Sequence, residues 1–191
     1  MLVVVNSDYR TGSTWVYNII REIFVVRNLE FESYGGSVEN IRDNILTDKN
    51  IIIKCHNYHD FRYHDNLKIL YTVRNYIDKR GSSLRYGEFK STSHSESIVN
   101  EVYYQKLANA FVISYDRYYY DPLYLIQHIN HFIFNDQLDR NSLQEIDDNT
   151  SIVAMKKISN RIESLQEADP ITEIRGSHIL NPKPGAYYEN N

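Results

Sequence analysis

The chain has 191 residues, 42% of them hydrophobic, and a formal net charge of −4. This composition predicts a single globular domain over residues 1–191 rather than disorder, and the acidic balance argues against a nucleic-acid partner. The single cysteine, Cys55, excludes an internal disulfide framework and a cysteine-rich zinc site. No apolar stretch is long enough to span a bilayer or to act as a signal peptide, so we expect a cytoplasmic protein with no membrane partner.

Short apolar runs predict buried β-strands, and helical patterns lie between and after them. The strands are expected at Leu2–Val5, Ile51–Lys54, Lys68–Val73 and Ala110–Ser114. The helices are expected at Thr14–Val26, Ser37–Asn44, Ile77–Tyr86, Ser97–Asn109, Pro122–Phe134 and Thr150–Glu167. This alternation predicts an α/β fold of three layers, in which helices cover both faces of a parallel β-sheet.

The loop after the first predicted strand, "SDYRTGSTW", has the features of an anion site. A helix that begins after a strand offers unpaired N–H groups and the positive end of its dipole. Gly12 permits close approach of the backbone, Ser13 and Thr14 add hydroxyl groups, and Arg10 adds a permanent charge. The loop lacks the second glycine and the lysine of an ATP-binding loop. An ordinary turn, capped by Ser13 or Thr14 with Trp15 in the core, explains the same residues.

The second strand ends in "IIIKCH", which brings two further functional side chains to the same edge. Lys54 and His56 are two residues apart on an extended segment, so their side chains point to the same face. Ligands of open α/β sheets bind at this carboxyl edge. His56 suits a general base and Lys54 suits the neutralisation of developing charge. Because the chain has seven histidines, an ordinary surface histidine is the alternative.

The third strand leads into "VRNYIDKRGSS", where a second anion site is expected. Arg74 lies at the strand end, Asp78 can begin the next helix, and Ser82 lies within that helix. A strand-end arginine and a hydroxyl of the following helix can converge on one anion. A surface arginine followed by an unremarkable helical serine is the alternative.

Taken in order, these stretches resemble the sulfotransferases that use 3′-phosphoadenosine 5′-phosphosulfate (PAPS), which have a P-loop NTPase-like fold. "YRTGSTW" resembles their 5′-phosphosulfate loop, "IIIKCHNYHDF" their K-T-H strand end, and "ILYTVRNYIDKRGSSLRYG" their 3′-phosphate segment. The resemblance implies that the first loop holds the 5′-phosphosulfate and that the third stretch holds the 3′-phosphate. The residues concerned are Arg10, Thr11, Gly12, Ser13 and Thr14 for the former, Arg74 and Ser82 for the latter, and Trp15 for the adenine.

Three later stretches extend the resemblance along the chain. "VISYDRYYYDP" places Tyr115 near the adenine, and "NTSIVAMKKIS" places Thr150, Ile152 and Met155 around it. Ile152 replaces the phenylalanine of the family, and an N-cap role is enough to explain Thr150. "RGSHILNPKPGAYY" resembles the segment that closes the cofactor site, which implies roles for Ser177, Lys183 and Gly185.

The activity that the resemblance implies is transfer of a sulfuryl group from PAPS to a hydroxyl or amine of a small-molecule or glycan acceptor. His56 would be the base, Arg10 and Lys54 would hold the charge on the leaving phosphate, and no metal would be required. Some branches of the family use an early glutamate as the base, so Glu22, Glu30 and Glu32 are reserve candidates.

The chain is short for this family, which bears on the acceptor pocket. The pocket is expected to be open or completed by another subunit of a homo-oligomer. The polar segment "EFKSTSHSES" is a candidate lining, and "SYDRYYYDPLYL" is another, although half-buried packing explains most of its tyrosines. Two other functions remain open: a sulfotransferase-fold protein that binds a nucleotide or other ligand without chemistry, and a small-metabolite kinase.

Overall fold

The computed structural model describes residues 1–35, 49–56, 66–85, 93–164, 167–176 and 183–185. These residues form one parallel sheet in the order β2-β3-β1-β4-β5. Its strands are β1 (Leu2–Ser7), β2 (Phe31–Gly35), β3 (Asn50–His56), β4 (Leu67–Val73) and β5 (Ala110–Ser114). The helices are α1 (Ser13–Val26), α2 (Tyr76–Arg85), α3 (His94–Gln105), α4 (Tyr115–Tyr118), α5 (Pro122–Phe134), α6 (Arg140–Thr150) and α7 (Ile152–Ser159). The predicted three-layer α/β architecture is confirmed.

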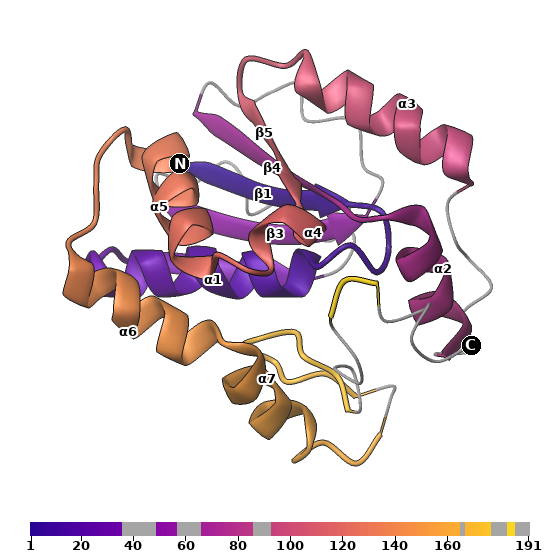
Figure 1. The fold of residues 1–191 in the computed structure, drawn as a ribbon. Coiled ribbons are helices and arrows are strands. Elements are labelled where there is room, and N and C mark those ends of the chain that lie inside the picture. The colour runs from indigo at the N-terminus through magenta and orange to yellow at the C-terminus, as the bar shows by residue number, and fades with distance from the viewer. Residues whose placement is uncertain (36–48, 57–65, 86–92, 165–166, 177–182, 186–191) are drawn as a thin grey trace.

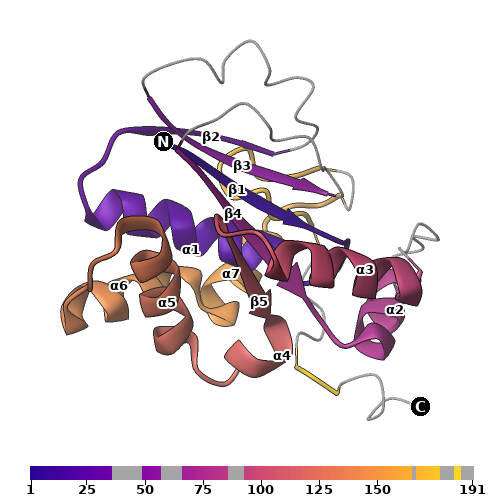
Figure 2. The ribbon, with the colours of Figure 1, turned by 90° about the horizontal axis from the view of Figure 1, so that it is seen from above.

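The sheet lies between two helical layers, as Figures 1 and 2 show. Because side chains alternate along a strand, β1 sends Val3 and Val5 to one face and Leu2 and Val4 to the other. The first face packs against α1, α5 and α6 in the larger apolar core. The second face packs against α3, whose Tyr104 is fully buried. Burial on both faces explains why the central strands read as continuous apolar runs.

The register of the strands determines where the site forms. Ser7, the last residue of β1, pairs with His56 of β3 and with Thr72 of β4. Val73 of β4 pairs with Ser114 of β5. Since all of these strands are parallel, the loops that follow them meet at a single edge of the sheet.

The predicted helix Thr150–Glu167 is wrong at both ends. Thr150 is the last residue of α6, and its hydroxyl donates a hydrogen bond to the carbonyl of Ile146 (2.8 Å). The N-cap of α7 is Ser151, whose hydroxyl accepts the N–H of Ala154, and α7 ends at Ser159. Thr150 therefore does not cap a helix.

Three elements escaped the sequence prediction, β2, α4 and α6, and one expected element lies outside the described residues. The helix α4 is only four residues long, which is too short for a helical pattern to reveal. The strand β2 is a short edge strand of half-buried residues, and α6 is strongly polar. Both lack the continuous apolar pattern on which the other predictions depended. The expected helix Ser37–Asn44 lies outside the described residues.

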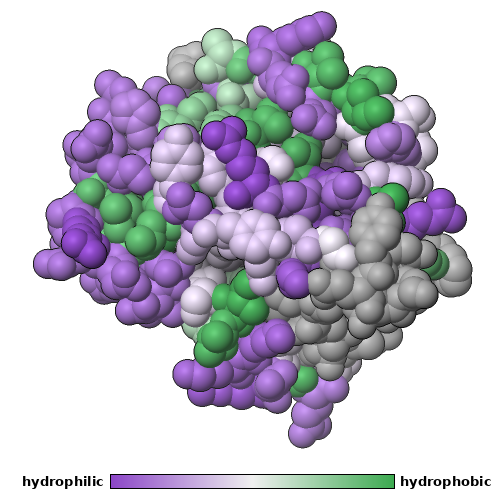
Figure 3. Space-filling model, viewed as in Figure 1, coloured by the Kyte–Doolittle hydropathy of each residue, from purple (hydrophilic) through white to green (hydrophobic). Residues whose placement is uncertain are grey.

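The helix α3 begins at His94, three residues before the predicted start at Ser97 and inside the polar segment 88–97 that is a candidate lining of the acceptor pocket. Ser93 and Glu96 form a reciprocal capping box, which fixes this start. On its outer side α3 exposes Ile98, Val99 and Val102, which contribute to the hydrophobic area at the upper right of Figure 3. Within the described ranges, no helix has both the length and the apolar character needed to cross a bilayer.

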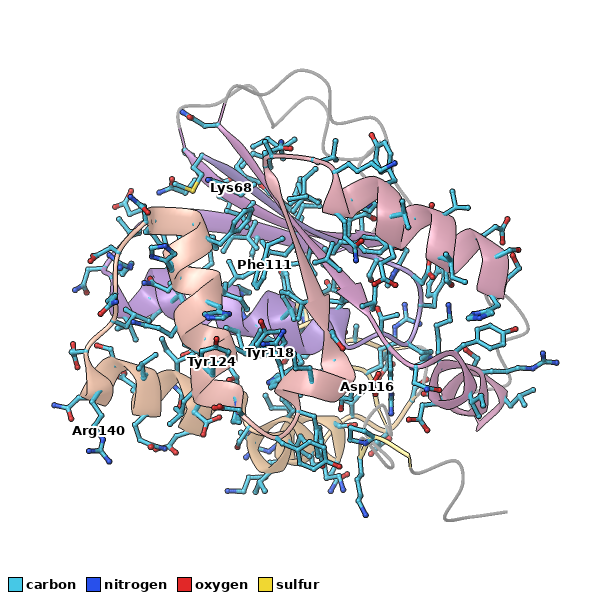
Figure 4. All side chains as sticks on the ribbon, turned by 45° about the horizontal axis from the view of Figure 1, so that its top comes forward. Lys68, Phe111, Asp116, Tyr118, Tyr124 and Arg140 are labelled. Atoms are coloured by element: carbon cyan, nitrogen blue, oxygen red, sulfur yellow. The ribbon has the colours of Figure 1, made fainter. Side chains whose placement is uncertain are left out.

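The tyrosine-rich segment is divided between the core and the surface. Tyr118 is buried, whereas Tyr124 remains partly exposed. Figure 4 shows both near Phe111 of β5, and His128 of α5 joins them through a hydrogen bond to the Tyr118 hydroxyl (3.1 Å) and close ring contact with Tyr124 (centroids 3.9 Å apart). The expected packing role is thus met at Tyr118, and Tyr120 is exposed.

Candidate functional site

The loop between β1 and α1 has the backbone of an anion cradle. Arg10 and Gly12 both have left-handed conformations, with φ of 66° and 92°. Gly12 is the N-cap of α1, and its carbonyl accepts the N–H groups of Trp15 and Val16 (3.0 and 3.2 Å). The cap is therefore this glycine rather than Ser13 or Thr14. As members of the first turn, those two residues have N–H groups without an acceptor inside the helix.

A hydroxyl pair anchors this loop to the neighbouring strand. The Thr11 hydroxyl donates to the carbonyl of Asp8 (2.9 Å) and lies 2.6 Å from the hydroxyl of Thr72 on β4. Thr11 is buried, so its side chain holds the loop in shape. A direct cofactor contact by Thr11, as the resemblance implies, remains a prediction.

Tyr115 connects the first loop to Arg74. A Cβ atom on Gly12 would lie 2.4 Å from Cδ2 of Tyr115, so the ring rests directly on the glycine backbone. The Arg74 guanidinium carbon lies 4.6 Å from the centroid of the same ring, within cation–π range. Trp15 meets the same ring edge-on at 5.7 Å. The two predicted anion sites are thus joined through a single aromatic ring.

Lys54 and His56 extend from β3 on the face covered by α1, as their spacing predicted. Cys55, between them, points to the other face, where its thiol donates to Asn6 (3.5 Å). The ammonium of Lys54 is in an unfavourable setting for a charge, since burial, Arg175 and Arg10 lower its pKa and Glu173 opposes them. The structure thus brings Arg10 and Lys54 together as predicted.

His56 is held neutral. Burial, followed by the charges of Lys54 and Arg10, lowers its pKa to about 4, although a contact with the Ser7 backbone acts in the opposite direction. Its Nδ1 lies 3.2 Å from the Ser7 carbonyl, and Tyr9 stacks on the ring at 4.1 Å. An Nδ1–H group that donates to this carbonyl leaves Nε2 as the proton acceptor.

The segment after β4 forms a second polar region at the carboxyl edge of the sheet, around Asn75 and Asp78. The N–H of Asn75 donates to Asp116 of α4 (2.6 Å), and the Asn75 side chain accepts the N–H of Ile77 (2.9 Å) at the start of α2. Asp78 accepts the N–H of Gly185 (2.7 Å), which brings the C-terminal segment against α2. Ser82 lies four residues beyond Asp78 on the same side of the helix. The predicted Arg74, Ser82 and Gly185 thus belong to one region.

Only some of the residues predicted to surround the adenine lie together in the structure. Trp15, Tyr115 and Met155 share the larger core cluster. Ile152 is half-buried at the start of α7. Lys183 is described, whereas Ser177 lies outside the described residues. Contact of this group with an adenine remains a prediction.

The reserve bases lie away from His56. Glu32 of β2 pairs with Ile51, three positions before the Lys54 level, and its carboxylate bonds to Lys49 and Tyr34. Glu30 precedes that strand. Glu22 accepts a hydrogen bond from Asn149 of α6 (2.9 Å), several turns along α1 from the first loop.

A buried ion pair escaped the sequence reasoning. The Asp8 carboxylate bonds to the Lys79 ammonium at 3.0 Å, and both side chains are less than 5% exposed. Ser97 of α3 donates to the same carboxylate (2.5 Å), and the Tyr71 hydroxyl lies 3.4 Å from its other oxygen. No local pattern signals this pairing, because its members are about 70 residues apart in the sequence.

Glu173 and Arg175, which also act on Lys54, belong to a loop that follows α7. Arg175 is the first residue of the predicted closing segment, and no sequence motif marks Glu173. The separation of over 100 residues between this loop and β3 hides the relationship in the sequence.

No protein-family model and no curated protein matches the sequence. Solved structures do match. Mouse sulfotransferase SULT7A1 complexed with PAP superimposes with a TM-score of 0.77 at 15% identity, covering 100% of this chain and 78% of that one. Retinol dehydratase, in complex with androsterone and the inactive cofactor PAP, gives a TM-score of 0.71 at 13% identity, covering 98% and 75%. The resemblance read from the motifs is thus confirmed at the level of architecture, and the chain has the fold of the sulfotransferases.

Proposed function

We propose that the protein is a PAPS-dependent sulfotransferase that acts on a hydroxyl or amine of a small-molecule or glycan acceptor. The observation that carries this proposal is the grouping of Arg10, Lys54 and His56 at the carboxyl edge of the sheet, beside the N-terminus of α1. Cations and a proton acceptor in one place suit a reaction in which an anionic group moves to a protonated nucleophile. The presence of PAP in the matching solved structures supports the choice of donor.

In the proposed reaction, the N–H groups of Ser13 and Thr14 and the side chains of Arg10 and Lys54 hold the phosphosulfate. Nε2 of His56 takes the proton of the acceptor as the acceptor atom attacks sulfur in line. The bond from sulfur to the bridging oxygen breaks, and its electrons remain on the leaving phosphate, whose charge Arg10 and Lys54 stabilise. The bound anions also raise the pKa of His56 toward neutrality, which makes it a better base.

The other end of the donor is proposed to bind between α2 and the C-terminal segment. Arg74 and Ser82 hold the 3′-phosphate together with Lys183, Gly185 and Ser177 of the last segment. The adenine then lies against Trp15 and Tyr115, with Thr150, Ile152 and Met155 around it. The contacts of Tyr115 support this arrangement, because its ring touches both the Gly12 backbone of the first loop and the Arg74 guanidinium.

Substitution His56→Ala tests the catalytic part of the proposal. We expect sulfuryl transfer from labelled PAPS to fall by roughly 10²–10⁴-fold, while calorimetric affinity for PAP stays within a few-fold. His131→Ala is the matched control, since this histidine is exposed on α5. Near-normal turnover of His56→Ala would reject His56 as the base.

The wild-type protein separates the other functions in the same assays. Binding of PAP without transfer to any member of a broad acceptor panel would indicate a binding protein. Thermal stabilisation by ATP with magnesium, and none by PAP, would indicate a kinase.

A further inference from the structure

A loop from the C-terminal part of the chain reaches the catalytic edge. Residues 168–175 form a tight hairpin, here called the 168–175 loop, in which Ala168 and Arg175 make an antiparallel bridge. Asp169 accepts the N–H groups of Ile171 and Thr172 (3.1 and 2.6 Å), and its own N–H donates to Ile174 (2.8 Å). The loop is therefore internally rigid.

The same loop is fastened to α1 and to the core. The side chain of Asn18 on α1 donates to the carbonyl of Thr172 (2.9 Å), and Ser159 of α7 donates to the carbonyl of Arg175 (2.8 Å). Ile174 is 1% exposed in the larger apolar core. These contacts fix the position of Glu173, which lies between Thr172 and Ile174.

Glu173 is placed against the end of β2. A Cβ atom on Gly35 would lie 2.1 Å from Cδ of Glu173 and 2.3 and 2.5 Å from its two oxygens, so the carboxylate occupies the space that a side chain at Gly35 would fill. Glu173 has a left-handed backbone with φ of 57°, which is unfavourable for a residue other than glycine. The surrounding contacts of the loop impose this conformation.

The strand register then relates this carboxylate to Lys54. Gly35 pairs directly with Lys54 in the parallel ladder of β2 and β3. Paired residues of neighbouring strands direct their side chains to the same face and have Cα atoms about 5 Å apart. The Glu173 carboxylate therefore lies on the face of Lys54, one strand away.

We propose that Glu173 is a positioning residue that keeps Lys54 protonated and oriented at the anion site. Of the other described groups that act on Lys54, Arg175 and Arg10 oppose its charge, and Cys55 supports it less than Glu173 does. Among the described residues, the titratable or charged groups that act on Lys54 or lie near Glu173 are Arg10, Arg175, Cys55 and His56, with Tyr17 and Arg21 on α1. Among them Glu173 supplies the principal negative charge. The inference takes its ligand from the proposed function, but the state of Lys54 can be measured without any ligand.

The first experiment follows the Lys54 side chain by NMR in the ligand-free protein with ¹³C-labelled lysine. The Lys54 signal is assigned by its loss in Lys54→Arg. We expect Glu173→Gln to move the titration midpoint of Lys54 down by about one pH unit, because a nearby negative charge is lost. Glu167→Gln, which neutralises an exposed acid just before the loop, is the control and leaves the midpoint in place.

Gly35→Ala provides an independent test that retains the acid. The new Cβ displaces the Glu173 carboxylate, so the midpoint falls as in Glu173→Gln, and the double variant shifts no further. Glu173→Asn replaces Glu173→Gln if the latter does not fold, because asparagine tolerates a left-handed backbone. A midpoint that is the same in the wild-type protein and in the Glu173 variants overturns the proposal.

Calorimetry with PAP then connects this effect to the anion site. In Glu173→Gln, affinity rises slightly below the Lys54 midpoint measured by NMR, where Lys54 is charged and a repelling carboxylate has been removed. It falls several-fold between the midpoints of the variant and the wild-type protein, where Lys54 has lost its proton only in the variant. In a Lys54→Arg background the fall in affinity disappears, since a guanidinium stays charged.

A loss of affinity that is uniform across pH contradicts a positioning role for Glu173. Failure of the wild-type protein to bind PAP at any pH rejects the proposed function, whereas the NMR result alone decides the role of Glu173.

Discussion

The surroundings of His56 oppose its protonation, and this makes the stability of the fold depend on pH. Burial and two neighbouring cations lower its pKa to about 4 from an ordinary value of 6.5. Below pH 6.5 the unfolded chain takes up a proton at this residue, whereas the folded chain does so only near pH 4. Stability therefore falls as the pH falls through this window, by up to about 3 kcal/mol.

Substitution His56→Asn removes this pH dependence. Between pH 7.5 and 4.5 we expect the free energy of unfolding of the wild-type protein to fall by about 2–3 kcal/mol more than that of the variant. Urea unfolding at the two pH values measures the difference. The exposed-site variant His131→Asn should behave like the wild-type protein, and an equal loss in His56→Asn would show that His56 is not held neutral.

Several residue assignments followed directly from local chemistry. Lys54 and His56 share a face because a strand alternates, and Arg10 and Gly12 lie in the turn because it follows a buried strand. Glu173 was not recognisable, since its significance comes from Gly35 and Lys54, which lie more than 100 residues earlier. A local pattern cannot report a contact between segments so distant in the sequence.

At the scale of elements, the ion pair between Asp8 and Lys79 joins three parts of the scaffold. Asp8 belongs to the loop after β1, Lys79 to α2, and their partner Ser97 to α3. A buried carboxylate without its cation is costly, because the low-dielectric interior cannot solvate it. The pair therefore ties the first loop to both helices on that side of the sheet.

Substitution Lys79→Met should lower the free energy of unfolding by about 3–5 kcal/mol, because it leaves the Asp8 carboxylate buried without a counter-charge. Adding Asp8→Asn should recover part of this loss. Urea denaturation measures both effects, with the exposed Lys157→Met on α7 as the control. A loss in the double variant equal to the sum of the two single losses would mean that the pair does not interact.

The success of the element predictions depended on how strongly each pattern was apolar. The strands β1, β3 and β4 are buried on both faces, so continuous apolar runs revealed them. The edge strand β5 is mostly half-buried, but its sequence AFVIS is still an apolar run. The edge strand β2 and the polar helix α6 present no such run. The misplaced start of α7 has a different cause: Thr150 and Ser151 are both good caps, but Thr150 still belongs to α6, where its hydroxyl bonds to the Ile146 carbonyl.

For the whole molecule, the attraction of an anion depends more on where the charges lie than on the net charge. The chain has a net charge of −4, yet the charges of Arg10 and Arg175 both act on Lys54 at a single edge of the sheet. A local positive field within an acidic protein attracts a small polyanion selectively over nucleic acid. This field is screened by salt over about 10 Å at 0.1 M ionic strength.

Raising the sodium chloride concentration from 0.05 to 0.5 M should therefore weaken PAP binding on the order of tenfold. Isothermal titration calorimetry at several concentrations gives the slope. Lys54→Met should flatten that slope, whereas the exposed Lys157→Met should leave it unchanged. A salt-independent affinity would indicate that these cations do not contact the anion.

The hydrogen bonds from Asn18 to Thr172 and from Gly185 to Asp78 join the last part of the described chain to elements made from its first half. During translation, the amino-terminal cradle leaves the ribosome long before its partners have been synthesised. A nascent chain therefore cannot make these contacts until residue 185 has been synthesised, and early termination codons upstream of that point should abolish the proposed binding of PAP even where the product remains folded.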